Sequence, residues 1–108
     1  MEMRDLHWSH AEKQLARRAF QKALENEKNA LILKFKDRAA KIKKIEDLWK
    51  LVYWAEQRGK EINEKYDYRY SVLPMVFGRL IREHDIEWQD LAGLGEAKME
   101  FVRAFAGL

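Results

Sequence analysis

The first part of the chain spaces its apolar residues as one helical face would. Steps of three, four and seven residues separate Phe20, Leu24, Leu31, Phe35, Ala39 and Ile42. The first glycine is Gly59 and the only proline is Pro74, so no breaker interrupts this pattern. Ser9 followed by Glu12 forms a capping-box motif at its start. We predict a single helix over about 9–44, roughly 50 Å long at 1.5 Å per residue.

This predicted helix is longer than a compact domain of the same chain length. Such a domain has a radius of gyration of about 13 Å, so the helix must extend beyond it. Ala30–Leu33 also places apolar groups on every side of the helix, which is unfavourable in water. We predict a homodimer whose copies cross near residues 30–35, with an interface formed by Leu24, Leu31, Leu33, Phe35 and Ile42. The alternative is a break near Glu25–Asn29, after which the helix folds back within one chain.

Three further helical patterns follow. Asp47 is a suitable N-cap for a second helix, whose predicted core stripe is Leu48, Leu51, Val52, Ala55, Ile62 and Tyr66. A third helix is predicted over about 70–84, with Pro74 in its first turn. A short helical turn over 86–92 ends at Gly93, and a last helix covers 96–106. No segment alternates like a strand, so we predict one all-α domain, 1–108: a long N-terminal helix (about 9–44) that forms a dimer stalk, and a C-terminal helical head (47–108).

The composition and the short apolar runs indicate the cellular compartment of the protein. Hydrophobic residues make up 47% of the 108 residues, which excludes wholesale disorder. Cysteine is absent, so disulfides, thiolate metal sites and a cysteine nucleophile are excluded. The polar segment Met1–His10 lacks the apolar run of a signal peptide, and apolar stretches such as Ala30–Leu33 are too short to cross a membrane. We expect a cytoplasmic protein.

Basic residues gather late in the first helix, relieved only by Asp37: Lys34, Lys36, Arg38, Lys41, Lys43 and Lys44. Such a run is usually the solvated face of a helix. The alternative function is therefore a helical dimer that binds nucleic acid through Lys34–Lys44, which steep salt dependence would reveal.

Residues that could carry catalysis are few. His7 and His10 are three apart, but no third ligand follows at a fixed spacing, so we interpret them, like His84, as surface histidines. The chain contains no glycine-rich phosphate loop, nucleophile elbow or HExxH motif. We expect no enzyme activity, no metal and no cofactor.

Aromatic residues in the second helix point to protein binding. At 100° per residue, Trp49 and Tyr53 fall on one flank of the apolar stripe and Trp54 on the other. Trp, Tyr and Arg are enriched in binding hot spots. The predicted partner-binding residues are Trp49, Lys50, Tyr53, Trp54 and Arg58. The alternative is that Trp49 packs under the first helix and Trp54 under the last. Tyr66–Tyr70 belongs either to the interface or to the wall between the second and third helices.

Several short strings share order and spacing with one known family: Trp8-Ser9, Ala11-Glu12, Asp47-Leu48-Trp49-Lys50-Leu51, Glu61-Ile62, Lys65-Tyr66-Asp67, Arg69, Ser71-Val72 and Val76-Phe77. Together they resemble the fluorescence recovery protein family of cyanobacteria, from about residue 8 to 106. The resemblance implies an all-helical homodimer with a stalk and a head, without enzyme activity or cofactor. It also implies binding to the photoactivated orange carotenoid protein, faster return of that protein to its orange form, and an end to phycobilisome quenching.

This sequence departs from the family's pattern within the partner-binding site that the resemblance implies. The family's partner-binding tryptophan corresponds to Trp49. Val52 and Tyr53 stand where the family has His-Asp, and Gly59 stands where it has an arginine, with Arg58 one residue earlier. From this we predict that the protein accelerates relaxation of orange carotenoid protein poorly or not at all.

Overall fold

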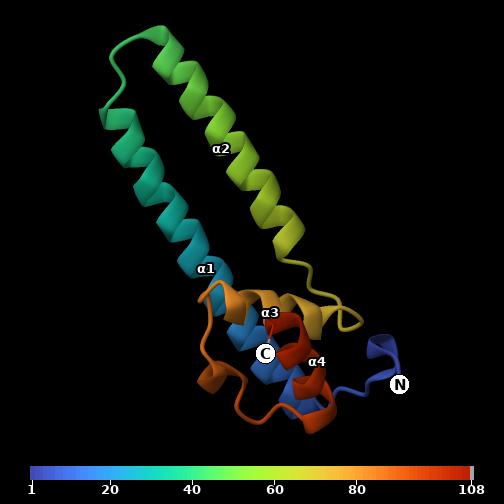
Figure 1. Ribbon diagram of the computed structural model, residues 1–108. Coiled ribbons are helices and arrows are strands. Elements are labelled where there is room, and N and C mark those ends of the chain that lie inside the picture. The colour runs from blue at the N-terminus through green and yellow to red at the C-terminus, as the bar shows by residue number, and fades with distance from the viewer. Residues whose placement is uncertain (108) are drawn as a thin grey trace.

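The protein is built from helices, as the sequence predicts. The computed structural model describes residues 1–107. Its elements are a short 3₁₀ helix η1 (Met3–Asp5), the helices α1 (His10–Ala40), α2 (Ile45–Lys65) and α3 (Leu73–Arg82), a 3₁₀ helix η2 (Trp88–Leu91) and α4 (Glu96–Ala106) (Figure 1). The all-α prediction and the long N-terminal helix are confirmed.

The start of α1 follows from its capping box. The backbone N–H of Glu12 donates to Ser9 Oγ at 3.1 Å, and the N–H of Ser9 donates back to Glu12 Oε1 at 3.0 Å. The helix ends at Ala40, four residues before the predicted end. Residues 41–44 then turn the chain.

The start of α2 differs from the prediction. Lys44, not Asp47, is the N-cap residue, and it offers no side-chain acceptor. Asp47 lies in the first turn, where its carboxylate accepts the Lys43 backbone N–H at 3.1 Å. The acidic residue still stabilises the helix start, because it bonds a free N–H and lies near the positive end of the helix dipole.

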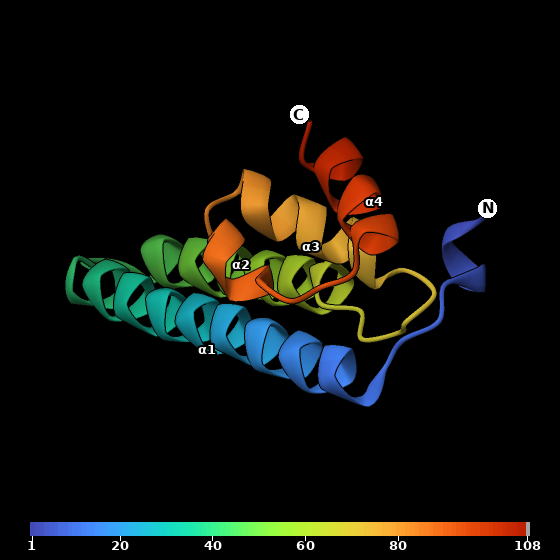
Figure 2. The same ribbon diagram turned by 90° about the horizontal axis from the view of Figure 1, so that it is seen from below.

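The two long helices form the stalk. After the turn, α2 runs back antiparallel along α1, and Figure 2 shows the pair side by side. The molecule measures 55 × 24 × 22 Å with a radius of gyration of 16.9 Å, so the stalk extends beyond the head. The alternative of a break near Glu25–Asn29 is wrong in its position, since α1 is continuous through that segment. The fold-back within one chain that it proposed does occur, at residues 41–44. The expected division at residue 47 also differs from the structure: α2 belongs to the stalk, because it packs on α1.

The head surrounds the first half of α1. Leu15, Ala16, Ala19, Phe20 and Ala23 are its buried residues. They join a core completed by residues of α3, η2 and α4, among which Leu73, Phe77, Leu80, Leu91 and Val102 are nearly inaccessible. The α3 and α4 helices lie on the same side of the stalk pair (Figure 2).

A glycine sets the crossing of α3 and α4. A Cβ built on Gly78 would collide with Phe105 Cβ and would lie 2.9 Å from the Val102 carbonyl oxygen. No real Cβ tolerates such contacts, so only glycine permits this close approach.

The remaining local predictions are largely confirmed. Pro74 lies in the first turn of α3, although that helix is shorter than the predicted 70–84. Gly93 has φ 103° at the end of η2, a conformation that favours glycine. The last helix has the predicted bounds. Within residues 1–107, no helix is both long and apolar enough to cross a membrane.

Candidate protein-binding site

One face of α2 carries large apolar side chains that remain largely exposed among the described residues 1–107. The α2 apolar stripe comprises Ile45, Leu48, Trp49, Val52 and Tyr53, at the spacing of one helical face. Trp49 is 62% exposed and Tyr53 66% exposed. Leu48 and Val52 were expected in the core of the second helix, but the expectation is wrong for them. The face that meets α1 is centred on buried Leu51, so both residues turn outward.

The other predicted partner-binding residues lie elsewhere on α2. Trp54 is half-buried, and the Arg38 guanidinium of α1 lies 4.2 Å from its ring centroid. Lys50 lines a hollow of about 250 Å³ where α1 and α2 meet. Arg58 donates to Glu61 at 2.8 Å. The structure thus places Trp49 and Tyr53 together and leaves Trp54, Lys50 and Arg58 off the stripe.

The stalk part of α1 exposes a second apolar set. Leu33 is 67% exposed, and Ile32 and Phe35 are also exposed. Leu31 and Ile42 are half-buried, whereas Leu24 packs against the head core of its own chain. Of the five residues predicted at a dimer interface, Leu33 and Phe35 are therefore the most available to a second chain. Sequence reasoning did not assign Ile32, although its place within Ala30–Leu33 carried the signal.

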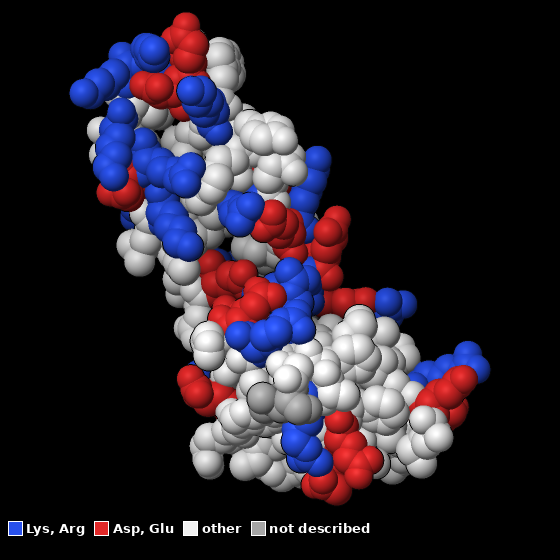
Figure 3. Space-filling model, in the orientation of Figure 1, with Lys and Arg blue, Asp and Glu red and all other residues white. Residues whose placement is uncertain are grey.

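The basic run is exposed along the far end of the stalk. All six of its Lys and Arg residues are solvent-accessible, and Lys41 pairs with Asp37 at 3.1 Å. On the face shown in Figure 3, cations gather over the end of the stalk, while acidic and basic groups mix where the stalk joins the head. This distribution is that of a solvated helix face.

A buried cation stands at that junction. Lys65, the last residue of α2, has a side chain only 4% exposed, with the carboxylates of Glu27, Glu83 and Asp85 within 3.1 Å. Burial alone would lower the pKa of Lys65, but hydrogen bonds to Asp85, Glu83 and Glu27 outweigh it and raise that pKa. No signal in the sequence reveals this cluster, because its members lie far apart along the chain.

Next to it, the Tyr66 hydroxyl donates to Glu27 at 2.5 Å. Burial, and then this hydrogen bond, raise the pKa of Tyr66. The stretch Tyr66–Tyr70 thus forms a wall, as one of the two interpretations of the sequence proposed, but it packs on α1: Tyr66 and Tyr68 both contact Phe20 edge-to-face.

Comparison with known proteins identifies the family. The sequence profile of a family described as photoprotection regulator fluorescence recovery protein matches residues 8–106. The chain belongs to the fluorescence recovery protein family. The fluorescence recovery protein of Synechocystis sp. PCC 6803 is 37% identical over 101 residues, covering 94% of this chain and 93% of the relative.

Solved structures agree with this assignment. The fluorescence recovery protein of Fremyella diplosiphon superposes with a TM-score of 0.89 at 39% identity, covering 94% of this chain and 100% of that chain. That of Synechocystis sp. PCC 6803 gives 0.89 at 36% identity with the same coverage. The resemblance seen in the sequence is confirmed, and the family is described as a regulator of photoprotection.

Proposed function

We propose that this member of the fluorescence recovery protein family acts in the cytoplasm as a homodimer that binds a protein partner through Trp49 and Tyr53. The observation that carries the proposal is the α2 apolar stripe. Its two aromatic rings lie one helical turn apart and are mostly exposed. Large exposed apolar patches mark interaction sites, and Trp and Tyr are the anchors that such sites favour.

The homodimer has its own support in α1. Ile32, Leu33 and Phe35 lie in the second half of α1 and are exposed among the residues that the structure describes. A second copy would remove these side chains from water, at about 25 cal/mol for each Å² of apolar surface buried. Because the stalk exposes apolar residues on both helices, a dimer through α1 and a partner on α2 are compatible.

The partner that the family implies is the photoactivated orange carotenoid protein. Val52 and Tyr53 replace the family's His-Asp, and Gly59 replaces its arginine, so the interface here is mainly apolar. Charged groups that a partner presents to the family's site would be buried here without an opposite charge. Each such unpaired charge costs about 2–5 kcal/mol of binding free energy. The protein therefore binds this partner weakly, or serves one with an apolar surface.

The test measures binding of the red form of orange carotenoid protein by size-exclusion chromatography at several concentrations. Unmodified protein should bind more weakly than a cyanobacterial family member, and Trp49→Ala should remove what binding remains. Trp88→Ala is the matched control, since Trp88 is also exposed but lies in the head. Equal losses in both variants, or none with Trp49→Ala, would rule out the α2 apolar stripe as the site.

A further inference from the structure

A second surface, whose cations lack acidic partners within residues 1–107, lies on the first half of α1. We name it the cationic face: His10, Lys13, Arg17 and Arg18, all exposed. Lys13, Arg17 and Arg18 form no ion pair with any residue within 1–107. Two other cations of the head are paired: Lys22 with Asp90 and Arg69 with Asp67.

The positive charge of this face is not neutralised locally. Between Glu12 and Glu25, α1 contains no acidic residue. Glu12 itself is turned inward, where its carboxylate accepts the backbone N–H groups of Ser9 and Gly95 and pairs with Lys98 at 3.0 Å. The Glu12 charge is therefore balanced by groups within the head and does not offset the charge of Lys13 or Arg17.

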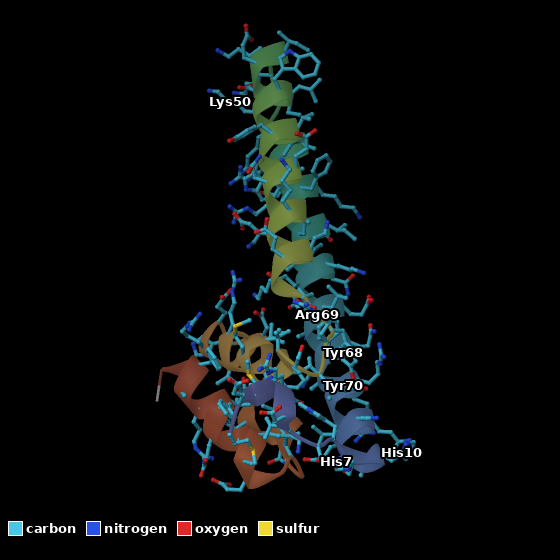
Figure 4. All side chains as sticks on the ribbon, turned by 90° about the vertical axis from the view of Figure 1, so that its right-hand side faces the viewer. His7, His10, Lys50, Tyr68, Arg69 and Tyr70 are labelled. Carbon is cyan, nitrogen blue, oxygen red and sulfur yellow. The ribbon has the colours of Figure 1, made fainter. Side chains whose placement is uncertain are left out.

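Two tyrosine rings, Tyr68 and Tyr70, lie beneath two of these cations and hold them in place. The Arg17 guanidinium lies 4.0 Å from the Tyr68 ring centroid, and Lys13 Nζ lies 5.3 Å from that of Tyr70. The rings are fixed in turn, since Tyr68 packs against Phe20 at 4.8 Å and Tyr70 against Trp8 at 5.4 Å. Figure 4 shows His10, Tyr68 and Tyr70 at the head end of α1, with Lys50 far away at the tip of the stalk.

This arrangement preorganises donors for an anion. A guanidinium that lies over an aromatic ring is held in a fixed orientation. Its N–H groups then remain free to form two parallel hydrogen bonds to one carboxylate. Burial, and then the neighbouring Tyr70 hydroxyl, raise the pKa of Tyr68 to about 12, so Tyr68 adds no negative charge near neutral pH.

The dimensions fit a short peptide segment. The surface forms an open hollow of about 530 Å³ lined by His10, Lys13, Gln14, Arg17, Arg18 and Tyr70. From His10 to Arg18 the helix rises about 12 Å, the length of about four residues of extended chain. Three free cations within that length match about three carboxylates on one segment.

We propose that the cationic face is a docking surface for a short acidic segment of a partner protein. Lys13 and Arg18 pair with its carboxylates, Arg17 binds one of them bidentately, and Tyr70 packs against an apolar side chain between them. Nucleic acid is the poorer match, since its affinity grows with the number of phosphates that are neutralised, and this face offers only three cations that are unpaired within residues 1–107. The inference does not depend on the α2 apolar stripe, which lies on the stalk.

The test uses a fluorescein-labelled peptide of about six residues, with glutamates on both sides of a leucine, and a control peptide with glutamine for glutamate. Fluorescence anisotropy measures their affinity for the full chain at low salt. The triple variant Lys13→Gln, Arg17→Gln, Arg18→Gln should weaken binding of the acidic peptide about tenfold or more, the loss of three surface ion pairs. The matched variant Lys34→Gln, Lys36→Gln, Lys44→Gln removes the same charge from the stalk and should change affinity less than about twofold.

Three further readouts sharpen the result. Trp49→Ala should leave peptide affinity unchanged, which separates this surface from the proposed function. Amide chemical-shift changes on titration should cluster at residues 10–18 and 68–70. A single-stranded oligonucleotide of equal charge should bind no more tightly than the peptide. Equal weakening by both triple variants, shifts spread over the stalk, or tighter oligonucleotide binding through the same three residues would overturn the proposal.

Discussion

The Lys65 ammonium lies 2.6 Å from the Asp85 carboxylate, which links the last residue of the stalk helix α2 to the segment after α3 in the head. Glu27 of α1 and Glu83 at the end of α3 reach the same ammonium at 3.1 and 2.8 Å. Because water has little access to Lys65, these carboxylates take the place of its hydration. One cation thus ties three segments together where the stalk meets the head.

Removing that cation should destabilise the fold. In Lys65→Met the three carboxylates repel one another without a counter-charge, and we expect unfolding free energy to fall by about 2–3 kcal/mol, since they are partly exposed. Urea denaturation measures the loss. Lys41→Met breaks an exposed pair with Asp37 and should cost less than about 0.5 kcal/mol. Equal midpoints for the two variants would contradict the role assigned to Lys65.

The Glu12 carboxylate should make the free energy of unfolding depend on pH in the acidic range. Burial alone would raise its pKa, but backbone hydrogen bonds from Ser9 and Gly95 and the Lys98 ammonium outweigh it and lower the pKa to about 2. A group with a lower pKa in the folded state stabilises the fold above its unfolded pKa of about 4.5 and loses this contribution as pH falls towards 2.

We therefore expect Glu12→Gln to be less stable than the unmodified protein at pH 7, by up to about 3 kcal/mol, with the difference shrinking between pH 5 and about 2. Urea denaturation at several pH values follows this difference. A Glu12→Gln difference that stays constant with pH would sink the assignment.

Two glycines should respond oppositely to alanine. At Gly78 a Cβ meets Phe105 and the Val102 carbonyl, so Gly78→Ala should push α3 from α4 and cost about 2 kcal/mol or more. At Gly59 the added Cβ meets no described atom within 4 Å beyond its chain neighbours and its own helix backbone, and φ is not positive, so Gly59→Ala should stabilise α2 by about 0.5–1 kcal/mol. Thermal melting of both variants gives the comparison, and a shift of the same sign in both would refute it.

The proposed dimer can be tested at an exposed position. Light scattering at micromolar concentration should give twice the chain mass of 13.0 kDa. Leu33→Glu should return the mass to 13.0 kDa with the fold intact, because Leu33 is exposed within its own chain, whereas an unpaired charge buried in a dimer costs several kcal/mol. Ala104→Glu adds the same charge on the surface of α4 and should leave the dimer unchanged. A monomeric unmodified protein would remove the proposal.

Restoring the charged site should restore activity. Val52→His, Tyr53→Asp and Gly59→Arg together should speed dark relaxation of orange carotenoid protein, which we expect the unmodified protein to accelerate poorly or not at all. The structure tolerates all three, since Val52 and Tyr53 are exposed and space surrounds Gly59. Decay of the red form in the dark, with the protein in excess, is the assay. Adding Trp49→Ala to the triple variant should abolish the gain. Unmodified protein that matches a cyanobacterial family member in rate would refute this prediction.

The sequence by itself determined the local features of this protein. The capping box of Ser9 and Glu12, the place of Pro74 in the first turn of α3 and the bounds of α4 all depend on residues three or four positions apart, which are neighbours in any helix. The length of α1 and its exposed apolar groups follow from the same periodicity, as does the placement of Trp49 and Tyr53 on one face. The family resemblance also rests on strings that can be read locally.

Only the tertiary structure decided which surface each helix face packs against. The turn at residues 41–44 directs Leu51 towards α1, and it thereby exposes Leu48 and Val52 and places Trp54 on Arg38. It also brings Lys65 to carboxylates 18 to 38 residues away in the chain. Helical periodicity groups residues into faces but does not say which other face each will meet, because that depends on how several helices bury their apolar surface together.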